Sequence, residues 1–407
     1  MKRFNDFFRC MSPLVLFMLF FSTTDVSAMK SNGPAADGHD SIRISLLTCA
    51  PGEEIYSLFG HTAIRYEDPA NGIDAVFNYG LFSFNTPNFI LRFSLGETDY
   101  QLGATDYARF AAEYAFDGRS VWQQTLNLSK EEKAELIRLL QENYLPENRV
   151  YRYNFFYDNC ATRPRDKIEE SIDGKVIYPA EPQDGSLSFR DIVHQYCKGH
   201  PWARFGIDLC IGSEADRPIT QRQMMFAPFY LMDAFAGAQI VHDSVQRPLV
   251  SGKELIVDAL PEEEEGGWMP TPFQCSLLLF ILTAAATIYS IRKRTGLWGV
   301  DLILFGAAGI VGCVLAFLAL FSEHPAVSSN FLLLVFHPGQ LLLLPYIIYC
   351  VRKGKKCWYL TLNLVVLTLF MVLFPLIPQR FDLAVVPLAL CLLIRSASNL
   401  ILTSKKK

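Results

Sequence analysis

The sequence DNCATR at residues 158–163 follows an aromatic, strand-like segment at 150–157 and precedes a helical segment, which places Cys160 at a strand-to-helix corner. Earlier in the chain, GHTAIR at residues 60–65 opens an alternating strand with a histidine, His61. A cysteine attacks as its thiolate and needs a base or a lowered pKa to do so. The two stretches therefore predict Cys160 as a nucleophile and His61 as its base. A buried or disulfide-bonded cysteine and a structural histidine are the alternatives.

The corner itself offers a way to lower the pKa of the thiol. Asp158 or Asn159 can cap the next helix, and Cys160 then lies in or just before the first turn. Unpaired N–H groups and the positive end of the helix dipole favour a thiolate there, and the same N–H groups could hold an oxyanion. Because Pro164 fits only in a first turn, we expect the regular helix to begin at or after Ala161.

The order of strands and helices before residue 181 indicates an α+β domain with a small antiparallel sheet. Strands are expected at 41–47, 61–67, 75–82 and 150–157, and a capping box at 129–132 opens a helix that ends near Tyr144. From 181 to 260 the signals weaken. The apolar segment at 224–232 is expected in the domain core, with a segment that dips into the lipid surface as the alternative.

The register of the hairpin decides whether Asn78 can orient His61. With a loop over residues 69–72, Ala63 faces Asn78, and the Asn78 side chain lies one diagonal step from His61. A two-residue loop at 71–72 would move Asn78 too far along its strand. We expect Nε2 of His61 to face the sulfur and Nδ1–H to face this orienting acceptor.

The N-terminus has the pattern of a targeting segment. Residues 1–28 contain basic residues near the start, a short apolar stretch, and small residues at 26–28. This pattern predicts a signal peptide, and an uncleaved anchor is the alternative; in either case the following segment is exported. We expect an exported domain over 29–265, with its core at about 41–180, and a membrane domain over 266–407.

The C-terminal third contains five apolar stretches long enough to span a bilayer. They lie near 273–291, 298–321, 331–351, 357–377 and 381–401. The connections at 291–294 and 352–356 and the tail at 405–407 are strongly basic, whereas the other two connections carry almost no positive charge. Because basic loops stay in the cytoplasm, we expect an all-α membrane domain of five helices with a cytoplasmic C-terminus.

Charge and cysteine content argue against nucleic-acid binding and against a metal site. The net charge is −4, and no basic stripe interleaved with aromatic residues points to nucleic acid. The expected exported domain keeps Cys49, Cys160, Cys197 and Cys210, of which Cys197 and Cys210 could close a short disulfide loop in an oxidising compartment. No Cys/His cluster has the spacing of a zinc site, so we expect no metal.

Polar residues inside or beside the spans are functional candidates because burying them in lipid is costly. His337 lies in the third expected span, and a kinked helix whose histidine pairs with a neighbouring span is the structural alternative. His324 is in the connection on the exported side, whereas Asp301 and Arg395 lie toward the cytoplasmic half. We count Arg65, Asn159, Arg163, His324 and His337 as candidate substrate-binding residues.

The motifs at residues 59–65, 77–80 and 159–163 resemble the exported N-terminal domain of the Lnb-type lipoprotein N-acyltransferases, and the five-span part resembles the rest of that architecture. The order of histidine before cysteine is also similar to the permuted NlpC/P60 group, with its papain-like fold. The resemblance implies a thioester on Cys160 and a base at His61. It places Asn78 where relatives often have a third polar residue, frequently histidine, so this chain departs from them there.

The implied reaction moves an acyl chain from a membrane phospholipid to Cys160 and then to the α-amine of a diacylglyceryl lipoprotein, without a cofactor, at the bacterial inner membrane. We expect the Cys160–His61 pair above the outer ends of spans two and three, with His337 lining a polar notch. A cell-wall endopeptidase or amidase is the first alternative. The second is a non-enzymatic membrane scaffold in which Cys160 forms a disulfide with Cys49.

Overall fold

A computed structural model describes the chain over residues 41–82, 87–179, 187–259 and 269–404. The expected signal peptide at 1–28, the residues between it and Ser41, and the lysine-rich tail lie outside the described residues. The expectations made for these segments therefore stay predictions.

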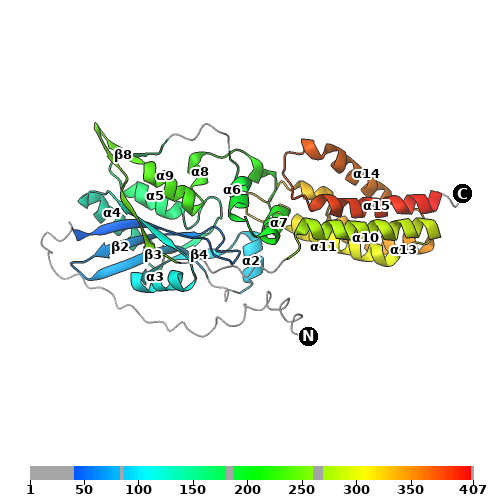
Figure 1. Ribbon diagram of the computed structural model, residues 1–407, viewed down its shortest axis with the longest axis horizontal. Helices are drawn as coiled ribbons and strands as arrows, with labels where there is room; N and C mark the ends of the chain where they lie inside the picture. Colours follow the sequence, from blue (N-terminus) through cyan, green and yellow to red (C-terminus); the bar gives the residue numbers. More distant parts are fainter. Residues whose placement is uncertain (1–40, 83–86, 180–186, 260–268, 405–407) are drawn as a thin grey trace. The chain divides into compact units, whose positions relative to one another are not determined.

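An antiparallel sheet of seven strands forms the centre of the N-terminal domain (Figure 1). Its spatial order is β10-β5-β1-β2-β3-β4-β6, and each neighbouring pair is antiparallel. The strands are β1 (Arg43–Cys49), β2 (His61–Asp68), β3 (Ile73–Leu81), β4 (Asp99–Asp106), β5 (Val121–Leu126), β6 (Val150–Arg152) and β10 (Val250–Val257). The α+β class is confirmed, and the sheet is larger than expected because β10 joins it from the segment with weak signals.

Helices cover both faces of this sheet, so the central strands β1 and β2 are buried on two sides (Figure 1). One face carries α3 (Tyr107–Phe116), and the other carries α4 (Lys130–Tyr144), α5 (Thr162–Ser171) and α9 (Pro228–Gly237). Alternate residues of a strand point to opposite faces, so the adjacent Leu46 and Leu47 of β1 enter different core clusters. Full burial of each such side chain stabilises the fold by roughly 1.5–3 kcal/mol.

The approach to Cys160 differs from the expectation. α4 is confirmed: Ser129 Oγ accepts from Glu132 N–H at 3.2 Å, and the Glu132 carboxylate accepts from Ser129 N–H at 2.7 Å. The strand expected at 150–157 is wrong in length, because β6 covers only Val150–Arg152. Asn154 Oδ1 accepts from the N–H groups two and three residues further on, which turns the chain ahead of the cysteine.

The segment between residues 187 and 259 completes the domain. Its elements are α6 (Phe189–Tyr196), α7 (Pro201–Cys210), η2 (Ser213–Asp216), α8 (Gln221–Met224), α9, β8 (Gln239–His242), β9 (Val245–Pro248) and β10, and β8 and β9 form a second sheet with β7 (Lys175–Ile177). Met225, Phe226 and Leu231 are buried. The apolar segment at 224–232 is therefore domain core, as expected, and the core extends past residue 180.

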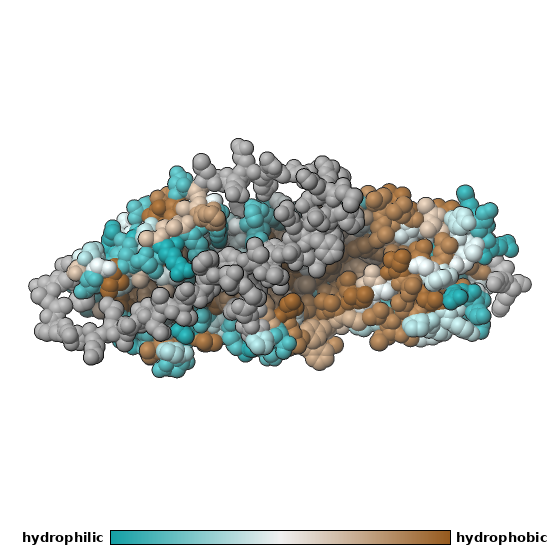
Figure 2. Space-filling view, turned by 90° about the horizontal axis from the view of Figure 1, so that it is seen from below, coloured by the Kyte–Doolittle hydropathy of each residue, from teal (hydrophilic) through white to brown (hydrophobic). Residues whose placement is uncertain are grey.

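Among the residues that the structure describes, four continuous helices of the C-terminal domain are long and apolar enough to cross a membrane. They are α10 (Pro272–Lys293), α11 (Trp298–Phe321), α14 (Trp358–Leu373) continued by η4 (Phe374–Leu376), and α15 (Val385–Ser404). Figure 2 shows hydrophobic surface over these helices and hydrophilic residues gathered at the end that bears the basic connections.

The third expected span is bent rather than straight. Residues 331–342, containing η3 (Phe331–Leu334) and α12 (Pro338–Leu342), meet α13 (Leu344–Lys353) at an angle of 74°. Prolines lie in the first turns of both α12 and α13, and proline cannot supply the backbone donor that would continue a helix through the break. The third expected span is thus a broken span or a re-entrant loop.

Two connections of the membrane domain hold the N-terminal domain. In the connection at 322–330, Ala326 O accepts from Gly212 N–H at 2.7 Å. In the connection at 378–382, Arg380 forms ion pairs with two aspartates of the N-terminal domain, at 2.6 and 3.0 Å. The connections without a basic run are therefore on the side of the N-terminal domain.

Candidate active site

Asn159 fixes the corner that carries Cys160. Its Oδ1 accepts from the N–H groups of Ala161 and Thr162 at 2.8 and 3.0 Å, and its Nδ2 donates to Phe155 O and Phe226 O at 2.7 and 2.9 Å. The residue is 2% exposed. The helix α5 begins at Thr162, directly after this cap, as the proline position predicts.

One consequence of this cap contradicts the sequence-based expectation. The N–H groups of Ala161 and Thr162 were expected to face a thiolate or an oxyanion, but the Asn159 side chain occupies both. The first turn of α5 therefore does not offer these donors to a substrate, and the N–H of Cys160 itself is the remaining local donor at the corner.

Cys160 packs against the adjoining ends of β2 and β3. A hydrogen bond from Thr62 N–H, next to His61, reaches the sulfur. On β3, a Cβ placed on Gly80 would lie 3.6 Å from the Cys160 Cβ, and Gly80 has a φ of 93°, which disfavours any side chain. The pairing of β3 with β4 also shifts register between Asn78 and Leu81, so Gly80 lies in an irregular part of the ladder.

His61 is oriented by Asn78, through the register that a loop at 69–72 predicts. Ala63 pairs with Asn78, and Nε2 of His61 lies 3.2 Å from Asn78 Oδ1. The Asn78 Nδ2 faces two acceptors, Val76 O and Thr105 Oγ1, each at 3.4 Å, which fixes the amide orientation.

This geometry selects the tautomer of the imidazole. Because the Asn78 oxygen can only accept, Nε2 of His61 carries the proton and Nδ1 keeps its lone pair. The expected ring orientation, with Nε2 toward the sulfur, is therefore wrong: Nε2 faces the orienting residue, and Nδ1 is the basic atom.

Burial keeps both candidate catalytic groups uncharged. Desolvation lowers the pKa of His61 to about 4, although the hydrogen bond with Asn78 opposes it. Desolvation raises the pKa of the Cys160 thiol to about 11, although hydrogen bonds from Thr62 N–H and from its own N–H act in the other direction. The expectation of a lowered thiol pKa is therefore wrong, and at neutral pH these pKa values correspond to a neutral thiol and a neutral imidazole.

Tyr151 is a site residue that the sequence did not single out. Its side chain is 7% exposed, and its buried hydroxyl has no hydrogen-bond partner within the part of the chain that the structure describes. A Cβ on Gly80 would lie 4.0 Å from this hydroxyl and 3.6 Å from the Cys160 Cβ, so both groups flank one backbone position. A buried hydroxyl without a partner, beside a candidate nucleophile, is a candidate donor to an oxyanion.

Two family models match the chain. The Lnb N-terminal periplasmic domain matches residues 35–184, and the Lnb transmembrane domain matches residues 263–407. The chain belongs to the Lnb family. It is a lipoprotein-related membrane protein with a periplasmic N-terminal domain followed by a transmembrane domain. No curated protein matches the chain. No solved structure matches it either.

Both candidate substrate-binding arginines form ion pairs within the periplasmic domain of this Lnb protein. Arg65 donates to both carboxylate oxygens of Asp74 at 2.8 and 2.7 Å and lies over the Tyr107 ring at 3.4 Å. Arg163 pairs with Asp158 in the same two-point manner, at 2.6 and 2.7 Å, and lies 3.5 Å over the Tyr151 ring. Arg163 thus supports the cysteine corner, whereas Arg65 stabilises the far part of β2.

The two candidate histidines of the membrane domain of this Lnb protein have other partners. Nε2 of His324 lies 3.0 Å from Phe93 O in α2 (Phe89–Leu95). His337 immediately precedes α12, and its Nε2 lies 3.3 Å from the Tyr359 hydroxyl of α14. His337 therefore pairs with a neighbouring span, as the structural alternative predicts.

Within the described ranges, the cysteines of this Lnb protein are free thiols. Cys197 and Cys210 do not form the disulfide that was considered for them. Cys49 lies opposite His61 in the β1–β2 pairing, is fully buried, and does not bond to Cys160. Burial raises the pKa of the Cys49 thiol to about 12, so it is a poor competing nucleophile. In the same described ranges no group of three His, Cys, Asp or Glu side chains could hold a metal ion.

Proposed function

We propose that this Lnb protein is a lipoprotein N-acyltransferase that carries an acyl chain as a thioester on Cys160. The donor is a membrane phospholipid, and the acceptor is the α-amine of a diacylglyceryl-cysteine at a lipoprotein N-terminus. The observation that carries the proposal is the placement of Cys160 at the strand ends that hold the His61–Asn78 pair. This site lies in a domain that hydrogen bonds and ion pairs hold against membrane helices.

The reaction proceeds in two halves with a shared base. Nδ1 of His61 accepts the thiol proton while Sγ of Cys160 attacks the ester carbonyl, and the tetrahedral intermediate expels the glycerol oxygen, which takes that proton from His61. A lysophospholipid leaves. The lipoprotein amine then attacks the thioester carbonyl and passes a proton to His61. The C–S bond breaks, the amide forms, and His61 returns the proton to the sulfur.

An uncharged Cys160 thiol and His61 imidazole are compatible with catalysis on a lipid ester. Separated charges in a buried, low-dielectric site are costly, so the proton moves only when the carbonyl is in place and negative charge passes to its oxygen. We assign the stabilisation of that oxyanion to Tyr151 Oη–H and to the N–H of Cys160. Burial raises the pKa of Tyr151 far above its ordinary value, so the hydroxyl remains a donor throughout.

An aromatic path supports a lipid donor rather than a cell-wall peptide. Tyr100 lies opposite Tyr151 in the β4–β6 pairing, and the Tyr151 hydroxyl and the Cys160 Cβ flank the same backbone position at Gly80. The aromatic path is the series of ring contacts Tyr153–Tyr100, Tyr100–Phe82, Phe82–Phe89 and Phe89–Phe93, at centroid distances of 4.1, 5.0, 5.6 and 6.1 Å.

The aromatic path ends at the membrane domain. Its last ring, Phe93 of α2, lies 6.1 Å from His324, just beyond the end of α11, and Leu95 O accepts from Glu323 N–H at 2.8 Å. Ile90 of α2 is 76% exposed. Exposed apolar side chains beside the end of a span are typical of contact with a lipid surface. An acyl chain could follow the path from the bilayer to Cys160.

The topology of the proposal follows the basic connections. The connections at 322–330 and 378–382 contact the periplasmic domain, so we place the strongly basic ends of α10 and α13 in the cytoplasm, together with the C-terminus. The protein is then a multi-pass protein of the inner membrane, with residues 1–28 as its signal peptide.

The direct test of the function is mass spectrometry of a lipoprotein N-terminus from cells that lack other N-acyltransferases. We expect an added N-acyl chain when the wild-type chain is produced and none with Cys160→Ser or His61→Ala. If the wild-type chain leaves lipoproteins unchanged but shortens cell-wall peptides in a Cys160-dependent manner, the endopeptidase alternative is correct.

A further inference from the structure

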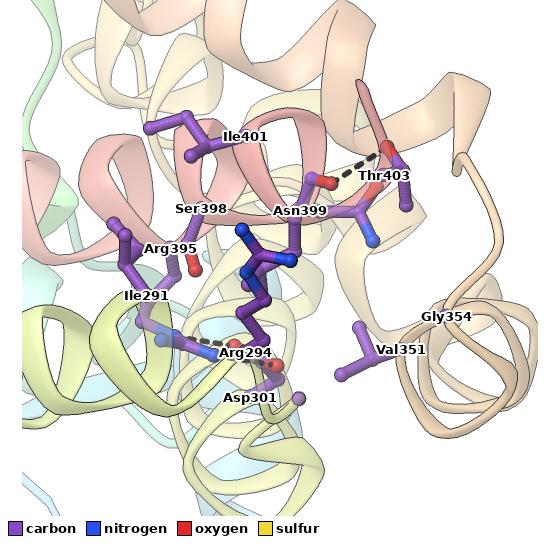
Figure 3. A pocket seen from close by; sticks show the side chains of 12 residues that line it. Ile291, Arg294, Asp301, Val351, Gly354, Arg395, Ser398, Asn399, Ile401 and Thr403 are labelled. Carbon is purple, nitrogen blue, oxygen red and sulfur yellow. Dashed lines mark hydrogen bonds and ion pairs between the residues drawn. The ribbon is translucent and has the colours of Figure 1, made fainter. Parts of the chain in front are cut away.

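A second polar site lies in the membrane domain, at the end opposite the periplasmic domain. It is a pocket of about 170 Å³ bounded by the ends of α10, α13 and α15 and the beginning of α11, and its lining includes Arg294, Asp301, Arg395, Ser398, Ile401 and Leu402. Figure 3 shows the Arg294 guanidinium and the Ser398 hydroxyl extending into the space beside the Asp301–Arg395 pair. The acyl-transfer mechanism uses none of these residues.

The charge of the pocket comes from Arg294. Arg395 donates through Nε and Nη2 to the two Asp301 oxygens at 2.7 and 3.0 Å, and both side chains are 2% exposed, so each neutralises the other. Arg294 forms no ion pair with any residue in the described part of the chain. The pocket therefore holds one positive charge that the protein leaves uncompensated.

Ser398 provides a second, independent observation. Ser398 is 1% exposed, and its Oγ has no hydrogen-bond partner among the described residues. A buried hydroxyl without a partner is unfavourable, and such a group that lines a cavity is a candidate donor to a ligand. Ser398 and Arg294 thus present a hydroxyl and a guanidinium to one space (Figure 3).

The ends of α10 and α13 beside the pocket are capped within the chain. The N–H of Arg294 donates to carbonyls of the last turn of α10, and the N–H of Gly354 does the same at α13. Both caps are left-handed, at φ 53° and 60°, a conformation that favours glycine. At α10 an arginine takes that position and directs its side chain into the pocket.

From this arrangement we infer that the pocket binds the phosphodiester group of a membrane phospholipid. A guanidinium and a hydroxyl donor match phosphate oxygens, and the apolar side chains of Ile401 and Leu402 at the rim provide a surface for the glycerol backbone and the first part of the acyl chains. Arg294 belongs to a basic connection, so the lipid comes from the leaflet on the side away from the periplasmic domain. This inference does not depend on the acyl-transfer reaction.

Native mass spectrometry of the full-length protein, delipidated in detergent and titrated with phosphatidylglycerol, tests the inference. We expect saturable binding of one lipid, weakened about tenfold or more by Arg294→Gln and about threefold by Ser398→Ala. Arg292→Gln is the matched control, since Arg292 is, like Arg294, an exposed arginine at the same helix end but lies outside the pocket lining, and it should change the affinity less than about twofold. Ser398→Ala removes a hydroxyl without a partner, so its thermal unfolding should match that of the wild type.

Two ligand controls identify the chemistry. Diacylglycerol with the same acyl chains lacks the phosphate and should not compete, and inorganic phosphate should compete only weakly because it lacks the apolar part. Equal binding of phosphatidylglycerol to wild-type and Arg294→Gln protein would overturn the site. Equal competition by diacylglycerol would overturn the phosphate assignment, and tight binding of inorganic phosphate alone would overturn the lipid assignment.

Discussion

Replacing Tyr151 by phenylalanine should separate activity from stability. The Tyr151 hydroxyl is buried without a partner among the described residues, and such a group costs about 1–3 kcal/mol when it is left unsatisfied. Its removal should therefore leave the free energy of unfolding unchanged or raise it by up to about that amount. If the hydroxyl donates to the oxyanion, the same change should cost about 2.7–4 kcal/mol of transition-state stabilisation, or a 10²- to 10³-fold loss in kcat.

Tyr79→Phe is the matched control, because Tyr79 lies 6.2 Å from Tyr151, ring to ring, but its hydroxyl donates to Asn143 Oδ1 at 2.7 Å. It should lose about 1 kcal/mol of stability and keep its activity. Both variants are assayed as full-length protein in phospholipid vesicles, with the initial rate of N-acylation of a diacylglyceryl peptide and with thermal unfolding. A Tyr151→Phe variant with the wild-type rate, or one that loses rate and stability together as a packing defect would, refutes the assignment.

Three further changes probe the rest of the site. Asn78→Ala should lower kcat by roughly ten- to a hundredfold, less than His61→Ala, because an orienting group is partly replaceable; equal losses in the two rate measurements would give Asn78 a larger role. The rate of alkylation of Cys160 by iodoacetamide should rise about tenfold per pH unit from pH 6 toward the thiol pKa of about 11, because only the thiolate reacts. A rate that does not change with pH above pH 6 would indicate a preformed thiolate–imidazolium pair. Asn159→Ala removes the side chain that caps the corner and leaves two backbone carbonyls without a partner. The free energy of unfolding, measured by heat or denaturant, should therefore fall by roughly 2–4 kcal/mol. A decrease of less than about 1 kcal/mol would contradict the capping role.

Local chemistry explains which parts of the site the sequence could predict. The turn residues at 69–72 fix the register that brings Asn78 to His61, and the proline at 164 fixes the beginning of α5, because both effects act within a few residues. The ring orientation of His61 and the raised thiol pKa depend on burial by distant segments, and nothing in a short motif reports that burial.

Long-range pairing accounts for the other differences. β10 pairs with β5 across more than a hundred residues of intervening chain, so its short, polar pattern gave no sign that it completes the sheet. Tyr151 is one of several aromatic residues before Cys160, and only the folded chain shows that its hydroxyl lacks a partner. The bend of 74° in the third apolar stretch is hidden in the hydropathy pattern, which measures length and not direction, although two prolines mark its place.

The central claim is that Cys160 carries the acyl group, and peptide mass spectrometry of the protein after incubation with a phospholipid of defined chains, without an acceptor, tests it most directly. The predicted result is a single acyl mass on the peptide that contains Cys160, released by neutral hydroxylamine and absent from Cys160→Ser protein. Transfer of that mass to a diacylglyceryl peptide should follow when the acceptor is added. An N-acylated acceptor formed at the wild-type rate by Cys160→Ser, or an acyl group found on another residue, would contradict the claim.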